Sequence, residues 1–173
     1  SSVSSSSLSS SSRSSSSSSQ VVGVEYIEST NAVANGVTVT IDRTALTQLQ
    51  DNDFVMIHYT YYNDMDTTVI PAGFTLLFNE RTTAGADSTH GVLYKYITDV
   101  SSEPTSWTFG STSSNEKVGV ATVWRNVDGA DPIDSYLPVI TSEGSNDATP
   151  NAPDFTTNQD AAMAITSCGL SYT

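Results

Sequence analysis

From residue 21 onward, apolar and polar positions alternate in short runs that are separated by turn residues. The run VTVTI at 37–41, after the turn signal Asn35-Gly36, predicts a strand with one buried and one wet face. The runs 54–59 and 118–124 are apolar on both faces and predict central strands. Further strands are predicted at 21–27, 73–78, 92–97, 106–109, 136–140 and 162–172.

These runs predict an all-β domain with hardly any helix. The strands at 73–78 and 92–97 are expected to form a hairpin across the polar loop 81–90, and a single turn of helix is expected at 46–50. About nine short strands at this spacing indicate an antiparallel β-sandwich, jelly-roll-like, over residues 21–173. The stretch 143–154, rich in Asn, Asp, Pro and Ser, is predicted to be the longest exposed loop.

Residues 1–20 have a different composition, because sixteen of these twenty positions are serine. The segment is predicted to be an extended N-terminal arm, either an authentic Ser-rich linker or a stretch whose serines stand in for unassigned side chains. A serine tract has almost no apolar surface to bury, so neighbouring chains would have to order it. The exceptions Val3, Leu8 and Arg13 are therefore predicted assembly contacts.

Net charge and cysteine usage limit the partners. Nineteen acids stand against six bases, which gives a formal charge of −13 without a basic stripe. This balance argues against nucleic-acid binding and against binding to anionic membranes. The single cysteine, Cys168, excludes an internal disulfide framework and is expected to be a small buried residue on a strand.

No catalytic apparatus is visible along the chain. His58 falls within a predicted buried strand and His90 lies beside a predicted turn, so both are interpreted as structural histidines. No phosphate-binding glycine loop or nucleophile elbow is present in the sequence. The sequence therefore predicts a protein that is not an enzyme.

Two sets of residues are candidate binding sites. Asp128, Asp131 and Asp134 could converge on a Ca²⁺ ion, which prefers hard oxygen ligands, although solubility and turn formation also explain them. Tyr61 and Tyr62 precede Asn63-Asp64 and are predicted to be exposed, where their rings could stack on a sugar. Apart from this possible Ca²⁺, no cofactor is expected.

Four segments occur in an order that resembles a phage virion family. They are Pro71-Ala72-Gly73-Phe74-Thr75-Leu76-Leu77, Leu93-Tyr94-Lys95-Tyr96, Glu103-Pro104 with Trp107-Thr108-Phe109, and Val123-Trp124-Arg125-Asn126-Val127-Asp128 with Asp131-Pro132-Ile133-Asp134. Together they are similar to a β-sandwich domain of phage and prophage virion proteins, over roughly residues 50–160. The resemblance implies a head decoration, head fibre or tail fibre protein, and it implies no catalytic residues.

The resulting expectation is a structural virion protein on the exterior of a bacteriophage particle, anchored by its arm to a capsid or tail protein. Ile165 and Leu170 lie on an apolar terminal strand that is expected to pair with another subunit, so copies of this chain are also expected partners. One alternative is a secreted carbohydrate-binding or adhesin module that recognises a host surface glycan. Another is an extracellular filament subunit, which would repeat head to tail without closing.

Overall fold

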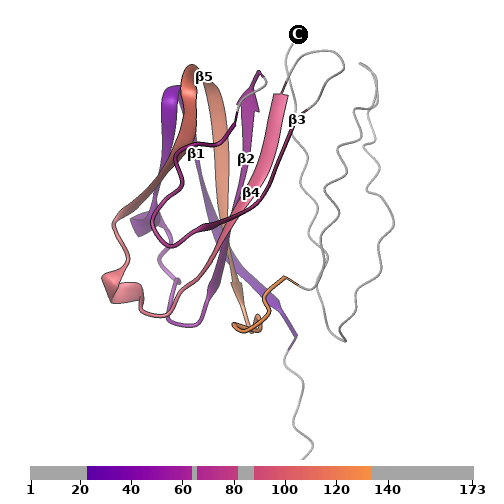
Figure 1. Cartoon of the computed structure of the whole chain (residues 1–173). Helices are drawn as coiled ribbons and strands as arrows, with labels where there is room; N and C mark the ends of the chain where they lie inside the picture. The colour runs from indigo at the N-terminus through magenta and orange to yellow at the C-terminus, as the bar shows by residue number, and fades with distance from the viewer. Residues whose placement is uncertain (1–22, 64–65, 82–87, 134–173) are drawn as a thin grey trace, which may run out of the picture.

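The computed structural model describes residues 23–63, 66–81 and 88–133 (Figure 1). This part of the chain is built from strands and two short 3-10 helices. The elements are β1 (Glu25–Asp42), η1 (Arg43–Ala45), β2 (Phe54–Tyr62), β3 (Thr75–Arg81), β4 (Ser88–Tyr96), η2 (Val100–Ser102) and β5 (Ser106–Arg125). The predicted all-β class is confirmed.

The strands form one open antiparallel sheet in the order β1-β5-β2-β4-β3. The predicted central strands are the middle of this sheet, since β2 pairs with β4 on one side and with β5 on the other. The predicted hairpin is also present as β3 and β4, although its strands are longer than expected and leave a shorter connection. Within the described ranges there is one sheet rather than the two of a sandwich.

Two pairs of predicted strands each belong to a single long strand. The described part of the predicted strand 21–27 and the predicted strand 37–41 are both parts of β1. Asn35-Gly36 does not form a turn between them, because both residues continue the pairing of β1 with β5, opposite Glu116 and Asn115. Likewise, the predicted strands 106–109 and 118–124 are both parts of β5. The expected helical turn at 46–50 is also wrong in position, because the 3-10 turn is η1, where Asp42 accepts a hydrogen bond from the backbone N–H of Thr44 at 2.9 Å.

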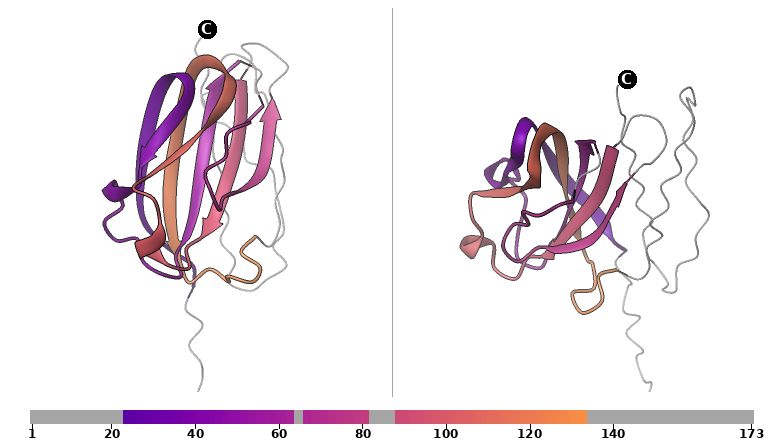
Figure 2. Two further views of the ribbon diagram at one scale, coloured as in Figure 1. Left: turned by 60° about the vertical axis from the view of Figure 1, so that its left-hand side comes forward. Right: turned by 45° about the horizontal axis from the view of Figure 1, so that its top comes forward.

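The long ribbon of β1 and β5 folds back over the sheet (Figure 2). The pairing of Gly36 with Asn115 is followed by that of Thr38 with Gly110, so the register of the two strands shifts at this point. Ten residues of extended strand would span about 33 Å. Yet the ring of Phe109 lies where a side chain of Gly119 would stand. The first half of β5 therefore packs against its own second half.

The main core lies between the sheet and the folded-back ribbon. The ribbon contributes Val39, Ile41, Trp107 and Phe109, and the sheet below contributes the inward side chains of β2, β4 and β5. Residues 68 and 69 extend this upper layer through backbone hydrogen bonds with Gly110 at 2.9 and 3.1 Å. The alternation predicted for 37–41 is confirmed for 39–41, where Val39 and Ile41 are buried and Thr40 is exposed, but it is wrong at Val37, which is 46% exposed.

The opposite face of the sheet carries a second, smaller apolar cluster. Phe54, Met56 and Val92 are buried there, and the last described segment packs against them through Val127 and Ile133. Trp124 also lies on this face, with its ring 5.4 Å from that of Tyr26. In the described ranges, no helix is long and apolar enough to cross a membrane.

Candidate functional site

An ion pair joins the end of β4 to the connection that leads into β5. The Lys95 Nζ lies 2.6 Å from Oε1 and 2.8 Å from Oε2 of Glu103. The two side chains are 16% and 6% exposed, so the pair is largely shielded from water. Buried charges of this kind need further hydrogen bonds to offset their desolvation. Lys95 also approaches the carbonyl of Ala72 at 3.4 Å, and the indole N–H of Trp107 lies 3.4 Å from Glu103.

A tight turn before β3 completes this group, which we call the junction cluster (Ala72, Gly73, Phe74, Lys95, Glu103 and Trp107). The backbone N–H of Phe74 donates to the carbonyl of Pro71 at 3.1 Å, and Gly73 has a φ of +80°. Turns with a positive φ at the third residue favour glycine. Phe74 then meets the ring of Trp107 edge to face at 5.2 Å.

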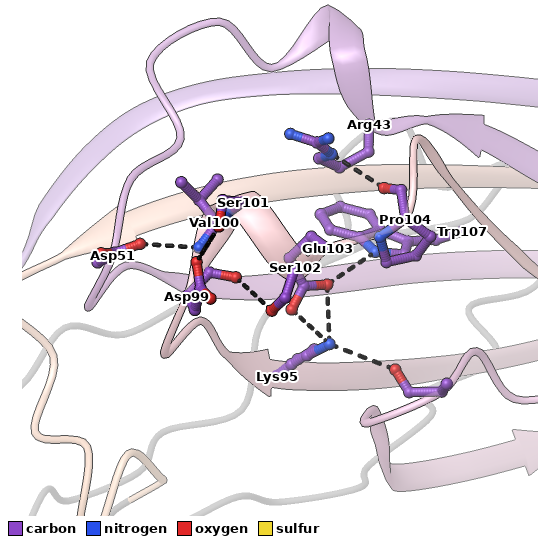
Figure 3. A network of polar contacts seen from close by, with 11 residues as sticks. Arg43, Asp51, Lys95, Asp99, Val100, Ser101, Ser102, Glu103, Pro104 and Trp107 are labelled. Atoms are coloured by element: carbon purple, nitrogen blue, oxygen red, sulfur yellow. Dashed lines mark hydrogen bonds and ion pairs between the residues drawn. The ribbon is translucent and has the colours of Figure 1, made fainter.

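The loop that carries Glu103 is held by further polar contacts (Figure 3). Asp99 caps η2 by accepting the backbone N–H of Ser101 at 2.9 Å, and hydrogen bonding from Ser101 lowers the pKa of Asp99. Asp51 accepts the N–H of Val100 at 2.7 Å, and Arg43 donates to the carbonyl of Pro104 at 3.0 Å. These bonds fix the loop against its neighbours.

The contacts of the junction cluster join three segments: the turn before β3, the end of β4 and the connection into β5. Its lysine is neutralised by a carboxylate, and that carboxylate accepts hydrogen bonds from two donors. A nucleophilic lysine or a general base needs a free electron pair and an approach for substrate. The arrangement instead resists separation of the three segments that it joins.

A second buried ion pair fixes the other end of β5. Arg125 donates from Nε and Nη2 to the two oxygens of Asp53, at 2.8 and 2.9 Å, which is a bidentate arrangement. This hydrogen bonding raises the pKa of Arg125. Asp53 is fully buried and also accepts the N–H of Gln50 at 3.0 Å. The loop between β1 and β2 is thereby fastened to β5.

Lys117 stabilises the point where the ribbon folds back. Its side chain is fully buried, and Nζ donates to the carbonyls of Gly36 and Ser113 at 2.8 and 2.9 Å. The same ammonium lies 5.1 Å from the ring centre of Tyr61, within cation–π range. Burial lowers the pKa of Lys117. Sequence analysis did not single out this lysine, because its role depends on contacts across the bend.

The two candidate sugar-binding tyrosines have different environments. Tyr61 is fully buried, so its predicted exposure is wrong: strand alternation directs it into the core, whereas Tyr62 points outward and is 44% exposed. The Tyr61 ring stacks on Tyr59 at 4.7 Å, and burial raises the pKa of Tyr61 to about 12. The hydroxyl of Thr67 joins both tyrosines, at 2.7 Å from Tyr59 and 3.3 Å from Tyr61. Sugar stacking stays a prediction for Tyr62.

The two histidines share the second face of the sheet. His90 lies between the hydroxyls of Thr60 and Ser88, with Nδ1 at 3.0 Å from Thr60 and Nε2 at 3.2 Å from Ser88. Sequence analysis missed this Ser–His contact, which arises from side chains two residues apart on one strand. Ser88 is buried, the other ring nitrogen of His90 contacts the hydroxyl of Thr60, and Glu80 of β3 pairs with His90 across the sheet.

His58 is expected to make the protein less stable in weak acid. Its Nδ1 is buried without a hydrogen-bond partner, and burial lowers the pKa of both His58 and His90 below the ordinary value of 6.5. The unfolded chain therefore binds protons first as the pH falls. This contribution to stability is complete above about pH 6.5 and is lost as the pH falls from there toward the folded-state pKa.

The measurement is urea unfolding at pH 7.5 and pH 5.5 for the wild type, His58→Leu, His90→Gln and the double variant that carries both changes. Each histidine should account for a loss of at most about 1.4 kcal/mol, the value of one pH unit. Each variant should lose less stability between the two pH values than the wild type does. An unchanged loss in the double variant would show that other groups are responsible.

The remaining candidate residues are only partly described. The carboxylate of Asp128 accepts the N–H of Ala130 at 2.9 Å, a local turn contact, and Asp131 is exposed. In the described ranges, no group of three His, Cys, Asp or Glu side chains is placed to hold a metal ion. The third candidate ligand, Asp134, lies outside the described residues. So do Cys168 and the predicted assembly residues Val3, Leu8, Arg13, Ile165 and Leu170.

Comparisons with family models, curated proteins and solved structures find no match for this chain.

Proposed function

We propose that the chain is a structural, non-enzymatic virion protein of a bacteriophage, a capsid decoration, head fibre or tail component. The observation that carries this proposal is how the four segments of the virion resemblance are used. Three of them, 71–77, 93–96 and 103–109, supply the junction cluster, and the fourth supplies Arg125, which binds Asp53. The motif residues thus hold loops in place through side-chain contacts, as expected for a protein with a structural role.

The jelly-roll-like sandwich is part of the proposal. The strands that the sequence predicts at 136–140 and 162–172 lie outside the described residues. The apolar cluster of Phe54, Met56 and Val92, already in contact with Val127 and Ile133, is where a second sheet would pack. The anchoring role of residues 1–20 is likewise proposed from their composition.

Peptide mass spectrometry of density-purified phage particles from the source material tests the virion role. Peptides of this chain should copurify with a major capsid or tail protein, at a constant ratio across the particle peak. A sedimenting fraction of lysate from cells without particles is the matched control. Recovery of the chain only in the soluble fraction would contradict the proposal.

The carbohydrate-binding module is kept as the second candidate because Tyr62 is exposed, as that function requires. If it is correct, a glycan array should give a signal that is lost in Tyr62→Ala. Tyr26→Ala is the matched control, because Tyr26 is also exposed (49%) but lies on a different strand. Retention of the signal in Tyr62→Ala would contradict a Tyr62 sugar site.

A further inference from the structure

β1 is one of the two edge strands of the described sheet. β1 is the first strand in the sheet order and pairs on one side only, with β5, among the described residues. Unpaired backbone N–H and C=O groups on a long edge strand are a template for another strand, and charged side chains commonly block such edges. The other edge strand, β3, ends in Glu80 and Arg81. Between Glu28 and Asp42, β1 has no charged residue, although the chain has a net charge of −13.

The uncharged part of β1 has a symmetric sequence. It reads Asn31-Ala32-Val33-Ala34-Asn35, which is identical in both directions about Val33. Its asparagines and its valine are exposed, whereas its two alanines are partly buried against the main core. An antiparallel pair of identical strands places each residue opposite its mirror position, so a palindrome is complementary to itself.

Val33 is the most exposed large apolar side chain that the structure describes, at 68%. It lies directly opposite Val118 of β5, which is itself 41% exposed. The two valines therefore form a short apolar row that ends at the edge of the sheet formed by the described residues. A singly exposed valine needs no explanation, but a valine row that ends at an unpaired edge continues naturally across it.

We propose that two copies of this chain pair antiparallel through residues 29–37 of β1, about a two-fold axis at Val33. The pairing makes one continuous sheet and brings the Val33 and Val118 side chains of both copies into a single row. Asn31 of one copy then faces Asn35 of the other, where the two amides can hydrogen bond. The acids are kept apart, because Glu25 and Glu28 both lie outside residues 29–37 and no residue within that segment is charged.

The bend in the ribbon sets the length of this interface. β1 turns over after Gly36, so a partner strand can follow only the straight part before the bend. A strand pair of this length buries less surface than a standard stable interface, and the dimer is therefore expected to be reversible and concentration dependent.

This dimer does not depend on the virion role, since it follows only from the edge strand, the charge pattern and the exposed valines. A two-fold dimer is closed, unlike a head-to-tail filament.

Sedimentation equilibrium of the 173-residue chain over a concentration series is the first test. The wild type should show a monomer–dimer equilibrium. Val33→Lys and Val33→Glu should each raise the dissociation constant of the dimer at least tenfold, because two like charges would meet at the axis. An equimolar mixture of the two variants should recover dimers, which also shows that both are folded. Ile70→Lys is the matched control, because Ile70 is 39% exposed outside β1, and it should behave as the wild type does.

Site-specific crosslinking tests the position of the axis. Directly opposed residues in antiparallel strands have Cα atoms about 4.5 or 5.5 Å apart, within the range that a disulfide spans. In a Cys168→Ser background, Val33→Cys should form covalent dimers on mild oxidation, whereas Ile70→Cys should not.

A wild type that remains a monomer at every concentration would overturn the proposal. That result would leave the β1 edge for residues 1–20 or for a different protein. Dimers that Val33→Lys does not weaken, or that Val33→Cys does not trap, would overturn it as well by placing the interface elsewhere. The mass-spectrometric test of the virion role is independent of all these outcomes.

Discussion

Gly119→Val is expected to destabilise the fold by about 3 kcal/mol, the size of effect that follows when a core phenylalanine loses its packing. The ring of Phe109 is fully buried and occupies the space that any side chain at Gly119 would need. Valine is favoured in strands when only local preference is considered. A loss of stability in this variant therefore reports the tertiary contact made by the folded-back ribbon.

Urea unfolding measures this effect against Gly36→Ala. Gly36 also lies within the ribbon, but the nearest atom to a methyl group there is the Thr38 carbonyl oxygen at 4.0 Å. Its replacement should change stability by less than about 1 kcal/mol. Combining Gly119→Val with Phe109→Ala should cost less than the two single changes together, because both act on one contact. Equal stability of Gly119→Val and Gly36→Ala would show that β5 does not fold back on itself.

Arg125→Met is expected to cost about 3 to 5 kcal/mol, because it leaves the fully buried carboxylate of Asp53 without its cation. Only the N–H of Gln50 would remain as a described donor to that carboxylate. Methionine keeps most of the length of the arginine stem, so the loss reports the missing charge and hydrogen bonds more than missing packing.

Two further variants complete the measurement, again by urea unfolding. Asp53→Asn in the Arg125→Met background should recover part of the loss, because a neutral amide is less costly to bury than an unpaired carboxylate. Arg81→Met is the control: the ion pair of Arg81 with Asp66 is 38% and 72% exposed, and such pairs contribute less than about 1 kcal/mol. Similar losses for Arg81→Met and Arg125→Met would contradict the importance of burial.

Two errors of the sequence-based prediction fall at the bend of the ribbon. Asn35-Gly36 has the local chemistry of a hairpin turn, and the polar run 111–115 has that of a loop. Both lie within long strands, because Asn35 and Gly36 of β1 pair with Glu116 and Asn115 of β5. Local sequence cannot report such a partner, since the pairing joins residues about eighty positions apart.

The site was partly visible in the sequence. The four segments of the resemblance were identified by their order, but the sequence did not show that Lys95 would meet Glu103 or that Arg125 would meet Asp53. Neither ion pair has a helical spacing that would predict contact. Tyr61 was misjudged for a related reason: it lies beside exposed loop residues, but its strand position directs it inward.

The sequence by itself determined the all-β class, the central strands and the β3–β4 hairpin, because a period of two in apolar residues is a local property of the backbone. It also determined the acidic charge and the symmetric segment about Val33. Only the tertiary structure decided that β1 and β5 are continuous and fold back, which charges are buried as pairs, and that the symmetric segment lies on an edge strand of the described sheet. These features depend on contacts between residues distant in sequence, where packing and desolvation outweigh local preference.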